Sequence, residues 1–467
     1  MSSKARSVRS RASSRAVVVP QPVTSSWSRA DTLVLAVLML AALLLYLWRL
    51  DQPREYIYDE VYHAYTAARL AEGNPAPYDP FATVPPEGKP VNAAYEWTHP
   101  ALAKLIMQGG ILLFGDTPLG WRFASAVFGA LGIGIFYVLG RTLFERRVGL
   151  TASVLLLLDG LWFVQSRTAM NDIFLVCFLL LAYLAFYHYL THPDTKRWRY
   201  LWLTGAALGL ALATKWSGLY SYGLMGMVAA VREVRLYVTK RSAAPLQALL
   251  TLAGAFVLVP AALYIGGYVQ YFGMGYGWSQ WRELQRQMVY YHTNLRACHD
   301  WASPGWSWPL LARPVWYYGA YPAAGTVANV FALGNPISWW PALPAIVLVA
   351  LRWRGQAYRS IGLGLVLLGF LGQWLPWLLS PRISYLYHML PSVPFGCLAI
   401  AYALHQLHVR RVLVWLYLAL VLAGFVYFYP QYAAVPISNA SADQHYWVRT
   451  WQPSSEWAYK CPSGATP

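Results

Sequence analysis

The sequence predicts an all-α integral membrane protein, and three features lead to that prediction. Hydrophobic residues occupy 57% of the 467 positions, whereas charged residues occupy only 12%. Apolar segments recur from about residue 31 to about residue 430, and the first is long enough to cross a bilayer core of about 30 Å as a helix. The 23 Trp and 34 Tyr gather beside these segments, where aromatic rings settle among lipid headgroups.

About eleven membrane spans are expected from the apolar segments. They cover residues 31–50, 119–140, 148–165, 170–190, 199–213, 216–231, 245–268, 336–351, 360–379, 385–404 and 412–429. Residues 1–30 are a basic tail, predicted to be disordered, in front of a membrane domain at 31–429. The first span is too long for a signal peptide and has no small-residue cleavage site, so we interpret it as uncleaved. Residues 430–467 form a final tail.

The distribution of basic residues predicts the orientation. Every connection on the same side as residues 1–30 is rich in Lys and Arg, as the positive-inside rule requires of cytoplasmic segments. These connections are 141–147, 191–199, 232–241, 352–359 and 405–411. The amino terminus is therefore expected in the cytoplasm and the carboxyl terminus outside, in a multi-pass protein of the plasma membrane. The net charge of +17 reflects this topology and some attraction to anionic lipid, not nucleic-acid binding.

Two outer segments, 51–118 and 269–335, are too long to be simple connections and are expected to carry function. In the first, Tyr58 to Leu70 predicts a short amphipathic helix, and His99 to Phe114 predicts an apolar helix that lies on or dips into the outer leaflet. The second segment is rich in aromatic residues, Trp308 among them. Such a surface stacks on sugar faces or lies at the lipid interface.

An acidic pair, Asp59 and Glu60, follows the first span directly, among Tyr56, Tyr58 and Tyr62. Poor solvation and a neighbouring like charge both raise the pKa of a carboxyl group, which favours a general base. The alternative is an interfacial tyrosine belt with two solvated acids.

Further ionisable residues lie in or near the outer ends of the spans, where charge is expensive and usually functional. They are His99, Lys104, Arg122, Asp159, Arg167, Asp172, Lys215 and Arg382. Together with the acidic pair they predict a cationic pocket with acids at its rim. The alternative for each is a structural ion pair, for example between Arg167 and Asp172.

Several short motifs resemble the protein O-mannosyltransferase family, bacterial type, of glycosyltransferase family 39. The resemblance extends from Tyr56 to Phe395, and the order and spacing of the motifs carry it. They are Tyr58-Asp59-Glu60, His99-Pro100-Ala101-Leu102-Ala103-Lys104, Ser166-Arg167-Thr168-Ala169-Met170-Asn171-Asp172, Lys215-Trp216-Ser217-Gly218, Ser303-Pro304-Gly305-Trp306-Ser307-Trp308-Pro309, Gly334-Asn335-Pro336 and Arg382-Ile383-Ser384-Tyr385-Leu386-Tyr387.

The resemblance implies a GT-C fold, a polytopic bundle with two long extracytoplasmic loops that contain short interfacial helices. It also implies inverting transfer of mannose from polyprenyl-phosphate-mannose to Ser or Thr hydroxyls of secreted proteins. The family's catalytic acid maps onto Asp59, its His-Pro-Pro motif onto His99 and Pro100, and its donor-phosphate arginine onto Arg122. Ala101 replaces the second Pro and Asn171 replaces an apolar residue. The β-trefoil insert of eukaryotic members does not fit within 269–335.

The residues fit this chemistry. A hydroxyl nucleophile gains from a carboxylate that accepts its proton, and we expect Asp59 to do so while Glu60 orients the acceptor or the sugar. A phosphate leaving group needs positive charge rather than a general acid, and we assign that role to Arg122 and Arg382, then Lys104 and Lys215. The residues expected to contact sugar or acceptor are Tyr58, His99, Arg167, Asp172 and Trp308.

No cofactor or essential metal is expected, because no tight His/Cys/Asp spacing appears. Cys298 and Cys461 both fall on the predicted outer side and are candidates for a disulfide, whereas Cys177 and Cys397 lie in spans. Two alternatives for the function remain open. One is a GT-C enzyme that moves another lipid-linked sugar to a lipid or polysaccharide, and the other is a transporter, although no internal symmetry is found.

Overall fold

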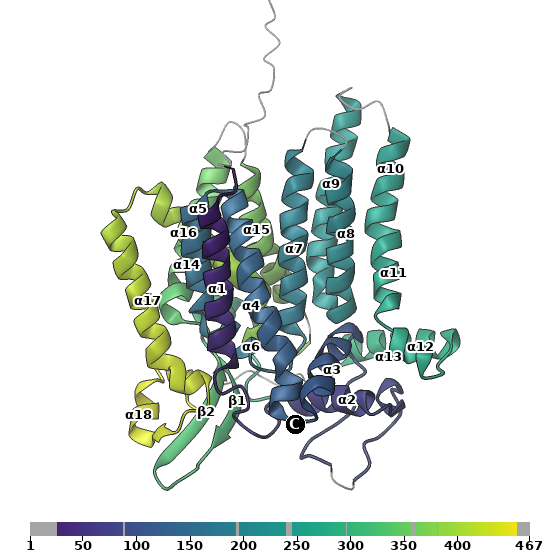
Figure 1. The fold of residues 1–467 in the computed structure, drawn as a ribbon, viewed down its shortest axis with the longest axis vertical. Helices are drawn as coiled ribbons and strands as arrows, with labels where there is room; N and C mark the ends of the chain where they lie inside the picture. Colours follow the sequence, from purple (N-terminus) through teal and green to yellow (C-terminus); the bar gives the residue numbers. More distant parts are fainter. Residues whose placement is uncertain are drawn as a thin grey trace, which may run out of the picture.

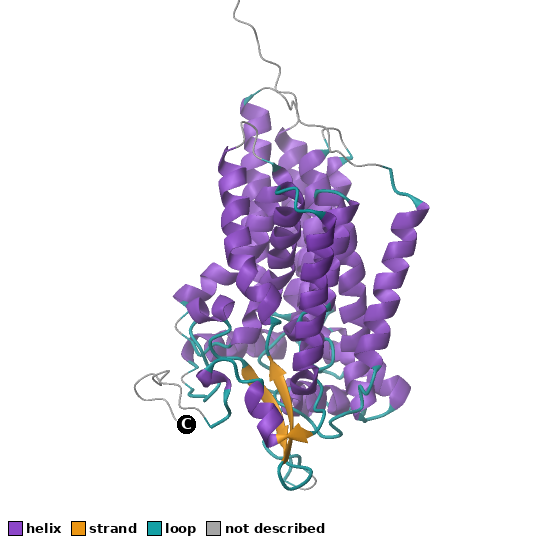
Figure 2. Ribbon diagram, turned by 90° about the vertical axis from the view of Figure 1, so that its left-hand side faces the viewer, coloured by secondary structure: helices purple, strands orange, loops and turns teal. Residues whose placement is uncertain are grey.

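The computed structural model describes residues 26–86, 89–192, 196–239, 245–295, 297–355, 360–380 and 382–454. Long helices stand roughly side by side, and shorter helices and a small sheet gather at one end of them (Figure 1). Turning the molecule shows the strands at that same end (Figure 2). The acidic pair and both long connections therefore lie at one end of the bundle.

The long helices follow the apolar segments of the sequence. They are α1 (Arg29–Leu47), α4 (Pro118–Leu143), α7 (Asp172–Thr191), α8 (Arg197–Thr214), α9 (Leu219–Val238), α10 (Pro245–Ala253) continued by α11 (Val259–Gly266), α14 (Pro336–Gly355), α15 (Ile361–Trp374), α16 (Val393–Gln406) and α17 (Arg411–Tyr432). In the part of the chain that the structure describes, seven helical segments are long and apolar enough to cross a membrane: Arg29–Leu47, Pro118–Leu143, Asp172–Thr191, Pro245–Gly266, Ile361–Leu379, Leu386–Gln406 and Arg411–Tyr432. The finer count of eleven remains a prediction.

The expected span at 148–165 is broken into α5 (Arg146–Leu157) and α6 (Gly160–Gln165). Asp159 sits at the break, where its carboxylate accepts hydrogen bonds from the backbone N–H of Trp162 at 2.9 Å and of Asn335 at 3.2 Å. It also accepts one from the indole N–H of Trp339 at 2.6 Å. Asp159 thus caps a helix and links it to the start of α14. Its described partners are neutral N–H groups, so this role differs from the ion pair considered as its structural alternative.

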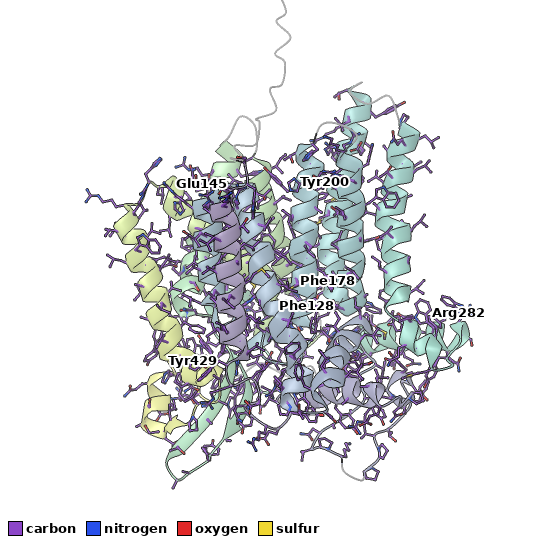
Figure 3. All side chains as sticks on the ribbon, viewed as in Figure 1. Phe128, Glu145, Phe178, Tyr200, Arg282 and Tyr429 are labelled. Carbon is purple, nitrogen blue, oxygen red and sulfur yellow. The ribbon has the colours of Figure 1, made fainter. Side chains whose placement is uncertain are left out.

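Helix α4 organises the packing, because it contacts α1, α3, α5 and α7. Its glycines allow close approach: a Cβ at Gly129 would meet Ser166 Oγ at 2.2 Å, and one at Gly132 would meet the Trp162 ring at 2.6 Å. At the end opposite the sheet, Asp31 receives hydrogen bonds from Arg141 and Arg146. Glu145 and Tyr200 lie toward that end, whereas Arg282 of α13 lies toward the other (Figure 3).

The first long connection folds into α2 (Glu60–Ala71), the 3₁₀ turn η1 (Ala76–Tyr78) and α3 (Leu102–Phe114). The second contains α12 (Val269–Gly273), α13 (Trp278–Asn294) and the 3₁₀ helix η4 (Gly305–Leu310). Helices α2 and α3 lie where the sequence predicts them. That they lie in the membrane interface remains a prediction.

The prediction of an all-α protein is wrong in one respect, since a three-stranded antiparallel sheet follows η4. Strands β1 (Val315–Ala320), β2 (Thr326–Ala332) and β3 (Ile437–Ser438) pair in that order, with a bulge between Trp316 and Tyr318. The β1 sequence is rich in the aromatic and β-branched residues that favour strands. We interpreted these aromatics as an interfacial loop, which hid the hairpin.

The residues after 430 are more than a tail. They include the end of α17, β3, α18 (Asn439–Gln444) and the 3₁₀ turn η7 (Arg449–Trp451). Trp451 is buried and its indole N–H donates to the Leu311 carbonyl at 2.6 Å. The segment therefore packs on the same end of the molecule as the sheet. Residues 1–25 of the basic tail lie outside the described residues.

Candidate active site

A cavity of about 1040 Å³ opens among the elements at the sheet end of the bundle. Its walls come from the start of α2, the connection before α3, the start of α9, the end of α13 and the stretch that leads into α16. Polar and aromatic side chains line it, including Tyr58, Asp59, His63, Glu96, His99, Lys215, His292, Arg382, Tyr385 and Tyr387. The cavity brings together Tyr58, Asp59, His99, Lys215 and Arg382 from the predicted set.

Asp59 occupies the position before the first turn of α2. Its backbone carbonyl accepts hydrogen bonds from the N–H groups of Tyr62 and His63 at 3.0 and 2.9 Å, so the helix fixes where the carboxylate leaves the chain. Burial raises the pKa of this carboxyl to about 6, although His63 and Lys215 nearby act to lower it. A carboxyl with such a pKa is poised to take a proton near neutral pH.

Tyr58 adopts a left-handed backbone conformation, with φ of 47°, just before Asp59. Its ring stacks on Tyr317 of β1, with centroids 4.3 Å apart and planes 7° apart. The rings of Tyr385 and Tyr387 meet it edge-on. A strained residue held by aromatic packing is typical of a functional site, and this packing links Asp59 to the sheet.

Glu60 and Arg122 do not line the cavity, so the structure does not support their predicted roles in catalysis and phosphate binding. The Arg122 guanidinium donates to both Glu60 oxygens at 2.8 and 2.7 Å and to the carbonyls of Leu50, Pro53 and Glu55. Its five N–H donors are thereby all used. Both side chains are almost fully buried. These contacts favour a structural role for the pair.

Glu60 also joins separate parts of the fold. Its carboxylate accepts the backbone N–H of Ala169, in the turn between α6 and α7, at 2.9 Å. It accepts the backbone N–H of Ile57, just before α2, at 3.0 Å. The Glu60–Arg122 pair therefore holds the segment that carries Asp59 against α4 and against the α6–α7 turn.

Glu96 is a cavity residue that the sequence analysis missed. Its carboxylate lies 2.9 Å from His99 Nδ1 and 3.5 Å from His63 Nδ1, and it is paired with Lys104. The signal for it was the three-residue spacing between an acid and a histidine in an otherwise uncharged stretch. Lys104 is buried and does not line the cavity, so its predicted role with the phosphate is not supported either.

The imidazole of His99 is neutral. Burial lowers its pKa to about 3, even though the Glu96 carboxylate acts to raise it. Since a neutral imidazole has one N–H and Nδ1 faces a carboxylate, the proton belongs on Nδ1 and Nε2 is an acceptor.

Lys215, at the end of α8, lines the cavity while bonded to a buried carboxylate. Its ammonium donates to both oxygens of Asp172, the first residue of α7, at 2.8 and 2.9 Å. It also lies 5.4 Å from the centre of the Tyr387 ring. Asp172 itself does not line the cavity but bonds to Lys215, which does. Its contact with sugar or acceptor remains a prediction.

Arg382 also lines the cavity, and unlike Lys215 it forms no salt bridge with a carboxylate of the described residues. One of its terminal N–H groups donates to Nδ1 of His292, from α13. His292 in turn donates from Nε2 to the Thr98 carbonyl at 2.8 Å. Burial and the nearby Arg382 lower the pKa of His292 to about 4, which keeps the ring neutral and able to accept this bond.

Arg167 and Trp308 were predicted to contact sugar or acceptor, and the structure places both elsewhere. Arg167 donates to the carbonyls of Tyr46, Trp48 and Arg49, where its charge complements the end of α1. Trp308 is fully buried and its indole N–H donates to Ser303. Both positions are structural.

Within the described residues, no group of three or more His, Cys, Asp or Glu side chains is arranged to hold a metal ion. Cys298 lines the cavity, and its expected partner Cys461 lies outside the described residues. Cys177 and Cys397 are free and buried, as expected for packing residues.

Two family models match the chain. One, described as dolichyl-phosphate-mannose-protein mannosyltransferase, matches residues 36–271. The other, described as the C-terminal four TMM region of protein-O-mannosyltransferase, matches residues 277–451. Together they cover every residue that lines the cavity and all of the bundle except the start of α1.

Known proteins resemble the chain in sequence and in fold. The polyprenol-phosphate-mannose–protein mannosyltransferase of Mycolicibacterium smegmatis is 30% identical over an alignment 425 positions long, which covers 76% of this chain and 82% of the relative. The protein of that name from Mycobacterium tuberculosis is 28% identical over 429 residues, 76% of this chain and 81% of the relative.

Among solved structures, the Pmt1-Pmt2 complex of Saccharomyces cerevisiae bound to the sugar donor superposes with a TM-score of 0.78. That match has 17% identity and covers 92% of this chain and 94% of the other. ArnT from Cupriavidus metallidurans bound to undecaprenyl phosphate gives a TM-score of 0.57 at 17% identity, over 85% of this chain and 70% of the other. These likenesses show a shared fold of the GT-C type. With the family models and the mycobacterial relatives, they establish that the chain belongs to the dolichyl-phosphate-mannose-protein mannosyltransferase family.

Proposed function

We propose that this protein transfers mannose from polyprenyl-phosphate-mannose to Ser or Thr hydroxyls of secreted proteins, with inversion at the anomeric carbon. The observation that carries the proposal is the cavity that places a half-buried carboxyl, Asp59, in one space with the cations Lys215 and Arg382. The mycobacterial relatives named for this activity support the choice of donor and acceptor.

The reaction requires the protein to accept a proton from the acceptor and to stabilise the departing phosphate. Asp59 takes the proton from the acceptor hydroxyl as its oxygen attacks the anomeric carbon, and the bond from that carbon to the phosphate oxygen breaks. The departing lipid phosphate carries the bonding electrons and is stabilised by Arg382, with Lys215 as the second cation. Arg382 takes the role that the sequence had favoured for Arg122, because Arg122 has no free N–H group.

The location of the site follows from the same proposal. We place the cavity on the extracytoplasmic face of the plasma membrane, the amino terminus in the cytoplasm and about eleven spans between them. The basic connections lie at the end away from the cavity, as the charge rule requires; that end holds Arg141 and Arg146.

The test is transfer of labelled mannose by the purified full-length protein from synthetic polyprenyl-phosphate-mannose. One reaction offers a peptide with a single Thr, a second offers the same peptide with Val in its place, and a third offers membrane lipid. Label on the Thr peptide alone supports the proposal. Label on lipid with none on peptide would favour the alternative, a GT-C enzyme with a lipid or polysaccharide acceptor.

The rate of transfer is expected to fall at acidic pH. Asp59 acts as a base only when deprotonated, and burial raises its pKa from 3.8 to about 6. Below that value kcat/KM should therefore drop about tenfold for each pH unit. The profile is measured between pH 4.5 and 8.5 with stability checked at each point. If kcat/KM began to fall only near pH 4, the base would be a solvated carboxyl group and not Asp59 as described.

Arg382→Ala is expected to weaken binding of the donor by about tenfold to a hundredfold, since charge-assisted hydrogen bonds contribute about 1.5–3 kcal/mol. KM for polyprenyl-phosphate-mannose should rise while KM for the peptide stays unchanged. The matched control is Arg354→Ala, an exposed arginine at the end of α14 and outside the cavity. An unchanged donor KM in Arg382→Ala would remove Arg382 from the phosphate site.

A further inference from the structure

Three histidines of the cavity wall form a continuous row between the two reactive ends of the site. His292 accepts the hydrogen bond from Arg382, and its ring lies 5.3 Å from the ring of His99. The His99 ring lies 5.6 Å from that of His63. His63 stands four residues after Asp59 on α2, which puts both side chains on one face of the helix. The row therefore runs from the phosphate-binding cation to the general base.

We propose that His63 and His99 of this row form the subsite for the hexose of the lipid-linked donor, that His292 connects them to Arg382, and that Glu96 is the residue that positions them. The inference rests on the proposed function for the nature of the donor. In an inverting displacement the acceptor oxygen and the phosphate lie on opposite faces of the sugar. The sugar must then lie between Asp59 and Arg382, which is the space that the row lines.

The chemistry of the row suits a ligand rich in hydroxyl groups. A neutral imidazole donates from one nitrogen and accepts at the other, as a hydroxyl also does, and carries no charge that would compete for the phosphate. The low pKa values of His99 and His292, about 3 and about 4, keep both rings neutral at physiological pH.

Glu96 and the Thr98 carbonyl fix how the rings are presented. The Glu96 carboxylate lies 2.9 Å from Nδ1 of His99 and 3.5 Å from Nδ1 of His63. Its charge is balanced by the ion pair with Lys104. Thr98 accepts from Nε2 of His292. Both nitrogens of His292 and Nδ1 of His99 are bonded to protein groups. Nε2 of His99 and the nitrogens of His63, whose Nδ1 lies 3.5 Å from Glu96 without a hydrogen bond to any described residue, are the atoms left for the sugar. The role of Glu96 is thus comparable to that of carboxylates that orient metal-bound or catalytic imidazoles.

The inference predicts a separation between sugar binding and phosphate binding. Binding is measured by titrating the intrinsic fluorescence of the full-length protein with polyprenyl-phosphate-mannose and with polyprenyl phosphate, which lacks the sugar. Trp97 and Trp216 line the cavity and serve as reporters. His99→Phe keeps the ring and removes its hydrogen bonds, so affinity for the mannosyl lipid should fall about three- to tenfold while affinity for polyprenyl phosphate stays the same.

Three further proteins complete the test. Glu96→Gln combined with Lys104→Met removes the two buried charges together. This double variant should lose affinity for the mannosyl lipid alone, which marks Glu96 as a positioning residue. His188→Phe is the matched control, since that ring packs on Tyr200 in α8, away from the cavity. Arg382→Ala should lower the affinity for both lipids by the same factor.

Specific outcomes overturn the inference. If His99→Phe lost affinity for both lipids equally, or lost affinity for neither, the row would be excluded as a sugar subsite. A wild-type protein that binds the two lipids equally would also exclude it. If the wild type prefers the mannosyl lipid in this way but labels no Thr peptide, the proposed function fails and the subsite stands.

Discussion

Asp59→Asn is expected to lower the rate of mannose transfer by about 10²–10⁴, the usual contribution of a positioned general base. Asn has nearly the same shape as Asp, so it preserves the start of α2 and the packing of Tyr58. It lacks a group that accepts a proton, and the acceptor hydroxyl must then attack without help. The loss should appear in kcat, with KM for the donor nearly unchanged, because Asp59 acts in the transition state.

Asp51→Asn is the control for this result. Asp51 precedes the same segment by eight positions, its side chain is exposed, and it contacts Gln52 rather than the cavity. Transfer by Asp51→Asn should match the wild type. Turnover of Asp59→Asn within about tenfold of the wild type, in protein with an unchanged melting temperature, would end the assignment of Asp59 as the base.

The sequence predicted the parts of the fold that depend on local patterns. Apolar length located the helices that are long enough to cross a membrane. Amphipathic spacing located α2, and a shorter apolar stretch located α3. Asp59 could be singled out because an acid beside a predicted span is costly unless it is used. These inferences need only neighbours along the chain.

The structure differs from the prediction where partners come from distant segments. Arg122 and Glu60 are 62 positions apart, and nothing in either neighbourhood reveals that each satisfies the other. Counting cations on the outer side therefore overestimated the cationic pocket: Arg122, Arg167 and Lys104 are engaged elsewhere in the fold. Glu96 escaped notice for the same reason, since its significance comes from contacts with His63 and Lys104.

Removing either partner of the Glu60–Arg122 pair is expected to destabilise the protein strongly. Breaking a buried ion pair by deleting one side leaves an unpaired charge, and this costs about 3–5 kcal/mol of unfolding free energy. Glu60→Gln retains the size of the side chain, and Arg122→Met retains much of its volume. Both should lower the melting temperature of the detergent-purified protein and reduce transfer, because the segment that presents Asp59 loses its attachment to α4.

The double variant Glu60→Gln with Arg122→Met distinguishes a structural pair from a catalytic one. If the pair serves the fold, removing both charges should recover part of the stability lost by each single change, because no charge is left unpaired in the interior. Arg286→Ala is the control: its bond to Glu283 lies on an exposed face of α13, and a surface pair contributes about 0–1 kcal/mol. A single change at Arg122 that left the melting temperature intact and raised only the KM of the donor would instead return Arg122 to the phosphate site.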